Sequence, residues 1–203
     1  MTIRHRSLKP SSAIRQTGRF LQLFYPANNA AYILASTQSS AMTVGTALTL
    51  LEQTTRGLTS FALTPGGAPA SAFTFDVVGE NQFGETVRES ITTGTSANIV
   101  HTVNCYRYIT SITPTAKSST GTDALSIGWT GVVTSGTPRL ALPCKPASTA
   151  SLRRFSICGA TGAMPTFTPE LTRYTVAISA QPLVGSTVMN AVICHTDEED
   201  TEI

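Results

Sequence analysis

Acidic side chains are the first candidates for chemistry in this chain. Glu85 and Glu89 would share one face of a β-strand, and glycosidases use paired carboxylates as acid and nucleophile. Four positions along a strand span about 13 Å, which exceeds the ~5 to 9.5 Å that those mechanisms use. The spacing therefore argues against a catalytic pair, and Arg88 between the two glutamates favours cross-strand ion pairing.

Two further groups of residues carry atoms that could bind metals. The His-x-Asp-x-Glu run that begins at His195 could present three ligands on one side of an extended chain, but an acidic tail explains it better. Asp76, Glu80 and Asn81 lie near an expected turn, without the 12-residue loop pattern of calcium sites. We predict no metal site and no cofactor.

The sequence contains none of the common catalytic signatures. It has no G-x-S-x-G, no H-E-x-x-H and no G-x-x-x-x-G-K motif. Its cysteines lie far apart without a C-x-x-C pair, at Cys105, Cys144, Cys158 and Cys194. This spacing predicts free, mostly buried thiols rather than a zinc site, although a disulfide between Cys144 and Cys158 stays open. We predict a protein that is not an enzyme, with no catalytic residues.

The element that positions most of these residues is a hairpin over 73–90. Phe73, Phe75 and Val77 alternate with polar residues, a polar reversal follows over 79–84, and Val87 resumes the period of two. Alternation of this kind predicts two antiparallel strands with one buried face. We interpret this hairpin as the nucleus of the fold.

Strand patterns recur along the rest of the chain with turn residues between them. We expect strands at 42–51 with a bulge at Gly45, at 57–63, 99–113, 125–130, 152–158, 174–178 and 188–194, and a contact loop over 159–170. Short strands at this spacing predict an all-β fold, an antiparallel β-sandwich or jelly-roll-like domain. We divide the chain into a basic N-terminal arm with its anchor (1–26), a β-sandwich core (27–136), and further strands in the same domain or a small lobe with an acidic tail (137–203).

The ends of the chain carry opposite charge, although the net charge is only +2. Cations crowd the first residues, and carboxylates crowd the last; as candidate subunit contacts we take Arg4, Arg6, Lys9, Arg15, Arg19, Asp197, Glu198 and Glu199. Either these ends are solvated tails, or a basic arm of one subunit lies on an acidic surface of the next. The small net charge argues against a nucleic-acid partner, and no apolar run is long enough for a membrane span, so we expect neither.

Several runs in the middle of the chain carry a resemblance. They are TFDVVGENQFGETVRESI at 74–91, YITSIT at 108–113 and LSIGWTG at 125–131. This pattern, a G-x-x-x-x-G turn followed by V-x-E-x-I, I-x-S-I and Gly-Trp, resembles a segment of small structural proteins of tailed bacteriophages. The resemblance covers about a third of the chain and implies a component of the virion that is made in the host cytoplasm.

From this resemblance and the charged ends we expect a non-enzymatic structural protein, and first a capsid decoration or cement protein. It would form a homo-oligomer, for which we favour a trimer, and bind the major capsid protein or tail and neck subunits through arms and loops. A neck, tail or baseplate protein is the first alternative. A carbohydrate-binding adhesin is the second, and it would need an exposed Trp129 to stack on sugar rings.

Overall fold

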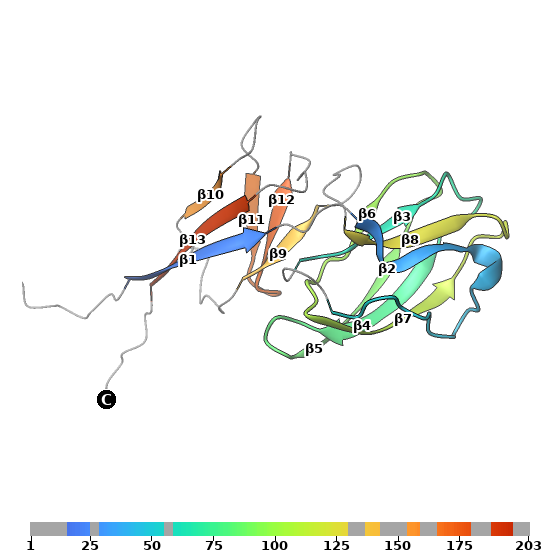
Figure 1. The fold of residues 1–203 in the computed structure, drawn as a ribbon, viewed down its shortest axis with the longest axis horizontal. Coiled ribbons are helices and arrows are strands. Elements are labelled where there is room, and N and C mark those ends of the chain that lie inside the picture. Colours follow the sequence, from blue (N-terminus) through green and yellow to red (C-terminus); the bar gives the residue numbers. More distant parts are fainter. Residues whose placement is uncertain are drawn as a thin grey trace, which may run out of the picture.

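The protein is built from β-strands arranged in antiparallel sheets. The computed structural model describes residues 16–24, 29–54, 59–129, 137–142, 154–158, 166–179 and 188–196. Within these ranges the helical structure is a single 3-10 turn, Ser39–Ala41. The expected all-β class is confirmed. Figure 1 shows an elongated molecule with strands β2 to β8 at one end and strands β1 and β9 to β13 at the other; we call these groups the central body and the terminal lobe.

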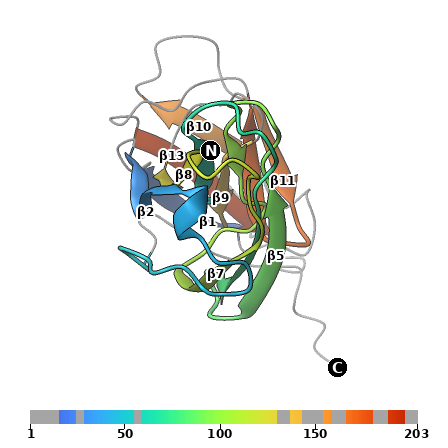
Figure 2. The ribbon, with the colours of Figure 1, turned by 90° about the vertical axis from the view of Figure 1, so that its right-hand side faces the viewer.

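The central body contains two sheets. The first has the strand order β2-β8-β3-β6 and the second β5-β4-β7. The strands are β2 (Asn29–Gln38), β3 (Ala62–Pro65), β4 (Thr74–Glu80), β5 (Thr86–Thr92), β6 (Val100–His101), β7 (Tyr108–Ala116) and β8 (Ala124–Trp129). In Figure 2, which looks at the body end of the molecule, β2 and β5 lie on opposite sides. The expected strands at 99–113 and 125–130 correspond to β6, β7 and β8.

Apolar side chains from both sheets form one hydrophobic core. Its fully buried members include Phe61, Phe75, Ile112, Ile127 and Trp129. The alternation along β4 is strict, with every second residue buried from Phe75 to Gly79. A half-buried strand of this kind is stable because one face loses its contact with water while the other stays solvated.

The predicted hairpin over 73–90 is confirmed as β4 and β5, paired in register from Thr74 and Thr92 to Glu80 and Thr86. Its turn is closed by the side chain of Asn81, whose Oδ1 accepts hydrogen bonds from the N–H of Phe83 (2.9 Å) and Glu85 (3.0 Å). Gly84 has φ +79, a conformation that favours glycine. These local interactions explain why the sequence pattern was sufficient to find the hairpin.

The strand expected over 42–51 with a bulge at Gly45 is wrong. The segment begins with a turn, in which Thr46 N–H donates to Thr43 O (3.1 Å), and then runs along the outer edge of β7. Gly45 N–H donates to Pro114 O (2.8 Å), and Leu48 N–H to Ile112 O (2.9 Å). Because Leu48 and Leu50 pack against the core, the segment has the apolar content of a strand without forming one. We call residues 42–54 the strap.

The described residues of the terminal lobe form two three-stranded sheets, with the orders β1-β13-β10 and β11-β12-β9. Its strands are β1 (Gln16–Phe24), β9 (Arg139–Ala141), β10 (Arg154–Cys158), β11 (Thr166–Glu170), β12 (Thr175–Ser179) and β13 (Val188–Thr196). The lobe thus combines a strand near the start of the chain with strands from its last third. Part of the expected contact loop over 159–170 forms β11; the remainder lies outside the described residues.

Candidate assembly site

One of the candidate subunit contacts, Arg19, lies in the terminal lobe. Among them the structure describes the backbone of Arg19, which lies in β1 opposite Ile193 of β13. The other seven lie outside the described residues and remain predictions; they are Arg4, Arg6, Lys9, Arg15, Asp197, Glu198 and Glu199. Residues 16–24, expected as part of an arm and its anchor, are paired with β13 within the same chain.

The pairing of β1 with β13 determines where the two charged segments are attached. The strands run antiparallel through nine successive pairs without a register shift, from Gln16 opposite Thr196 to Phe24 opposite Val188. Arg15 is bonded to the first residue of β1, and Asp197 follows the last residue of β13. The basic and acidic segments are therefore attached at neighbouring points of one sheet.

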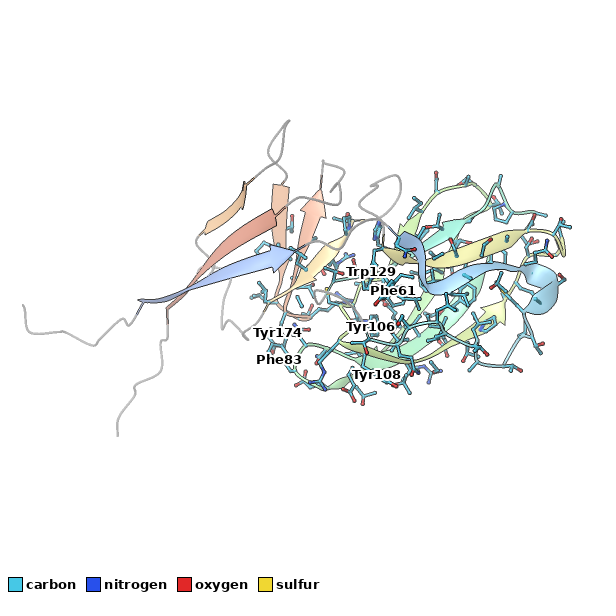
Figure 3. The ribbon with its side chains drawn as sticks, viewed as in Figure 1. Phe61, Phe83, Tyr106, Tyr108, Trp129 and Tyr174 are labelled. Atoms are coloured by element: carbon cyan, nitrogen blue, oxygen red, sulfur yellow. The ribbon has the colours of Figure 1, made fainter. Side chains whose placement is uncertain are left out.

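The tip of the hairpin joins the central body to the terminal lobe. Gln82 Nε2 donates a hydrogen bond to Tyr174 O (2.9 Å) and lies 3.3 Å from Leu142 O. The rings of Phe83 and Tyr174 meet edge to face, with centroids 5.5 Å apart. Figure 3 shows these two rings together at the boundary between the two groups of strands. Tyr174 has φ 52, an unusual value for a residue with a side chain, at this point of contact.

A paired arginine makes the second contact between the body and the lobe. The guanidinium of Arg139 donates from Nε (3.1 Å) and a terminal nitrogen (3.0 Å) to the two carboxylate oxygens of Glu170. The backbone N–H of Arg139 donates to Ser60 Oγ (2.8 Å), and Ser60 N–H donates to Arg139 O (3.0 Å). Burial alone would raise the pKa of Glu170, but the hydrogen bond and charge of Arg139 outweigh it and lower the pKa. The two-point pair fixes β9 against β11 within the lobe, and the backbone hydrogen bonds with Ser60 connect β9 to the body.

Glu89 is half-buried and belongs to a hydrogen-bonded cluster near this contact rather than lying beside Glu85. Its Oε1 accepts from the hydroxyl of Tyr106 (2.8 Å), and its Oε2 from the N–H of Val103 (2.8 Å) and Asn104 (3.4 Å). Burial raises the pKa of Glu89 even though these hydrogen bonds and the charge of Arg139 act in the opposite direction. Glu85 instead accepts a hydrogen bond from the amide of Asn81 (2.9 Å). The structure thus assigns the two glutamates to separate environments.

Two side chains close to Glu89 are buried. Tyr106 is 0% exposed and Cys105 is 2% exposed, and burial raises the pKa of both side chains. The Cys105 thiol is free, as expected for the cysteines. A substrate could not reach the Tyr106 hydroxyl or this thiol without movement of the surrounding strands. We therefore interpret the cluster as part of the joint between body and lobe.

Other residues considered for binding have structural partners. Asp76 pairs with Arg88, the cross-strand ion pair expected from the sequence, and Glu80 pairs with Arg107 (2.8 Å). In the part of the chain that the structure describes, no group of three metal-ligating side chains occurs. Trp129 is 1% exposed and lies in the core, so it cannot serve as the sugar-stacking platform of an adhesin. His195 belongs to β13, and the acidic residues after it lie outside the described residues.

Sequence reasoning missed the residues that form the joint. Arg139 and Glu170 are 31 positions apart, and Gln82 and Tyr174 are 92 apart. None belongs to a motif, and period-two patterns report which face of a strand is buried, without identifying its partner. One local signal was available: Arg139 precedes the buried run Leu140 to Leu142, which favours a paired over a solvated side chain.

Comparison with protein-family models, with curated protein sequences and with solved structures finds no match for this chain. Among the described residues, no helix has the length and apolar character needed to cross a bilayer.

Proposed function

We propose that this protein is a non-enzymatic structural component of a tailed-bacteriophage virion, and specifically a capsid decoration or cement protein. The observation that carries the proposal is the pairing of β1 with β13, which attaches the basic segment 1–15 and the acidic segment 197–203 at neighbouring points of one sheet. The resemblance of residues 60–131 to phage structural proteins supports the same conclusion.

In this proposal the terminal lobe presents both charged segments to neighbouring subunits. Segments outside a folded lobe add contact area to an interface without enlarging the core. Two segments of opposite charge that are attached side by side can bind an acidic and a basic surface on adjacent capsid subunits. We therefore expect the protein to bind at a junction between capsid subunits rather than on one flat face. The central body and its joint to the lobe then serve as a rigid spacer.

Removal of residues 1–15 tests this proposal. The structure restricts the deletion to these residues, because 16–24 form β1 and their removal would also expose one side of β13. The truncated protein is expected to keep the circular dichroism and Trp129 fluorescence of the full chain. It should no longer bind particles made without the native protein, as measured by co-sedimentation.

A charge variant provides the matched comparison. Replacement of Arg4, Arg6, Lys9 and Arg15 by glutamine preserves chain length while removing the positive charge. Its binding to particles should be weak and insensitive to salt, whereas binding of the native chain should weaken as salt rises. Normal decoration by both variants would overturn the proposal. A low-resolution image of decorated particles would separate the capsid role from a neck, tail or baseplate role.

A further inference from the structure

The outer edge of β1 is the longest regular strand edge in the described part of the molecule. β1 has nine residues and, among the described strands, pairs with β13 alone. Its sequence, QTGRFLQLF, contains one charged residue, Arg19, and no proline. An edge of this kind offers a row of N–H and C=O groups to another strand.

The edges of the central body carry features that block such pairing. The outer edge of β7 is covered by the strap, through hydrogen bonds from Gly45 to Pro114 and from Leu48 to Ile112. β2 pairs with β8 through two register shifts, and β6 has two residues. β5 is shorter than β1 and carries Arg88, whose side chain is 68% exposed. Charges, bulges and covering segments are the usual means of protecting sheet edges.

The remaining edges of the terminal lobe are shorter or interrupted. β11 contains Pro169, which has no N–H to donate. β9 is bridged to the body through Thr59 and Leu140. β10 has five residues and begins with Arg154. Among the described edges, β1 therefore stands out as the longest regular one, with Arg19 as its single charge and with no proline, register shift or covering segment among the described residues.

We propose that β1 pairs antiparallel with β1 of a second copy of this chain, which joins two β1-β13-β10 sheets into one six-stranded sheet. The partner is a second copy because such a pair needs two strands of matching length with open edges, and within the described residues this chain offers only β1. A two-fold axis through the pair satisfies the whole edge of both copies at once. Pairing of β1 with the five-residue β10 of a neighbour would leave part of each β1 edge open.

This inference rests on and deepens the proposed structural function, since it names the surface for the expected self-association and proposes a dimer in place of the trimer favoured from the sequence. Backbone hydrogen exchange of the full chain tests it directly. In an antiparallel edge strand, successive N–H groups point alternately toward the inner neighbour and outward. The N–H groups of β1 that β13 does not engage should exchange slowly at high protein concentration and rapidly after dilution, while the other set stays slow.

Two adjacent proline variants, Phe20→Pro and Leu21→Pro, provide an independent test by sedimentation. One position directs its N–H to β13, so its proline should unfold the lobe; the other should keep the fold and give a monomer where the native chain is a dimer. A monomeric or trimeric native chain, or a folded proline variant that remains dimeric, would overturn the proposal. If both variants unfold, the concentration dependence of exchange decides. These measurements need no phage particle, so failure here is distinct from failure of decoration.

Discussion

The central body and the terminal lobe use the chain in different ways. The body is formed by strands β2 to β8, which follow one another along the sequence and share one hydrophobic core. The lobe is formed by β1 together with β9 to β13, so its sheet β1-β13-β10 contains strands from near both ends of the chain. Contacts that are distant in sequence require loop closure before they contribute to stability.

This difference assigns distinct roles to the two parts. All strand pairs of the body, including the distant pair β2 and β8, lie within residues 29–129, whereas the lobe depends on the pairing of β1 with β13 and on the joint through Arg139 and Gln82. We therefore expect the body to remain folded under changes that disrupt the lobe. Trp129 is the only tryptophan in the chain and lies in the body, so its fluorescence reports this half selectively.

The largest expected effect comes from opening a cavity in the body. Phe75 is fully buried in the shared core, and Phe75→Ala should lower the free energy of unfolding by about 3–5 kcal/mol. Urea denaturation followed by Trp129 fluorescence measures the change. Val44→Ala is the control, because Val44 is 50% exposed and its truncation should change stability by less than about 0.5 kcal/mol. Equal effects of the two substitutions would contradict the assignment of the core.

The lobe side of the joint is tested next by Arg139→Gln, which removes the pair between β9 and β11 and keeps the backbone hydrogen bonds to Ser60. The Arg139 and Glu170 side chains are 15% and 23% exposed, so loss of the guanidinium leaves a largely buried carboxylate and should lower stability by about 2–3 kcal/mol. In a urea titration of this variant, the circular dichroism signal should fall at lower urea concentration than the fluorescence of Trp129 changes. Arg173→Gln is the matched control, since Arg173 is 44% exposed and 3.9 Å from the same carboxylate; we expect a change below about 0.5 kcal/mol. A reversed order of the two effects would refute this account of the joint.

A smaller effect distinguishes Glu89 from Glu170 by pH. Burial raises the pKa of Glu89 above its usual 4.5, so the folded state retains this proton to higher pH than the unfolded state. The unfolding free energy should therefore decrease as pH rises from about 4.5 through the raised pKa. Glu89→Gln should flatten this slope, because the titrating carboxyl is removed.

Glu170 gives the opposite dependence because its pKa is lowered. Its stabilising contribution is present above the unfolded pKa and is lost as pH falls through the folded pKa. Glu170→Gln should accordingly reduce the decrease in unfolding free energy that the native chain shows as pH falls through this pKa. The comparison fails if Glu89→Gln preserves the native slope above pH 4.5, as measured by urea denaturation at several pH values.

The sequence predicted the parts of the body whose interactions are local. The hairpin was found because Phe75 and Val77 alternate with polar residues and Asn81 closes the turn within five residues. The buried face of β8, with Leu125 and Trp129, followed from the same period. The segment 42–51 was misassigned because a strap against the core needs apolar residues as a strand does.

The lobe was less accessible to sequence reasoning. Its individual strands have recognisable patterns, but the sequence of β1, QTGRFLQLF, does not identify β13 (Val188–Thr196) as its pairing partner. The joint likewise depends on a turn residue, Gln82, and on an arginine and a glutamate from different strands. Pairing between distant segments is determined by the whole assembled structure, which a local period does not encode.

A disulfide between β1 and β13 tests the central claim most directly, because the register places Gly18 opposite Cys194. Directly paired positions of antiparallel strands have Cα atoms about 4.5–5.5 Å apart, which lies within the roughly 4.4–6.8 Å that a disulfide spans. Gly18→Cys should therefore form an intramolecular bond with Cys194 on mild oxidation, identified by peptide mass mapping. Thr17→Cys, which lies opposite His195, should not. A Gly18→Cys protein that leaves Cys194 unpaired, or equal cross-linking by both variants, would contradict the closure of the chain ends in one sheet.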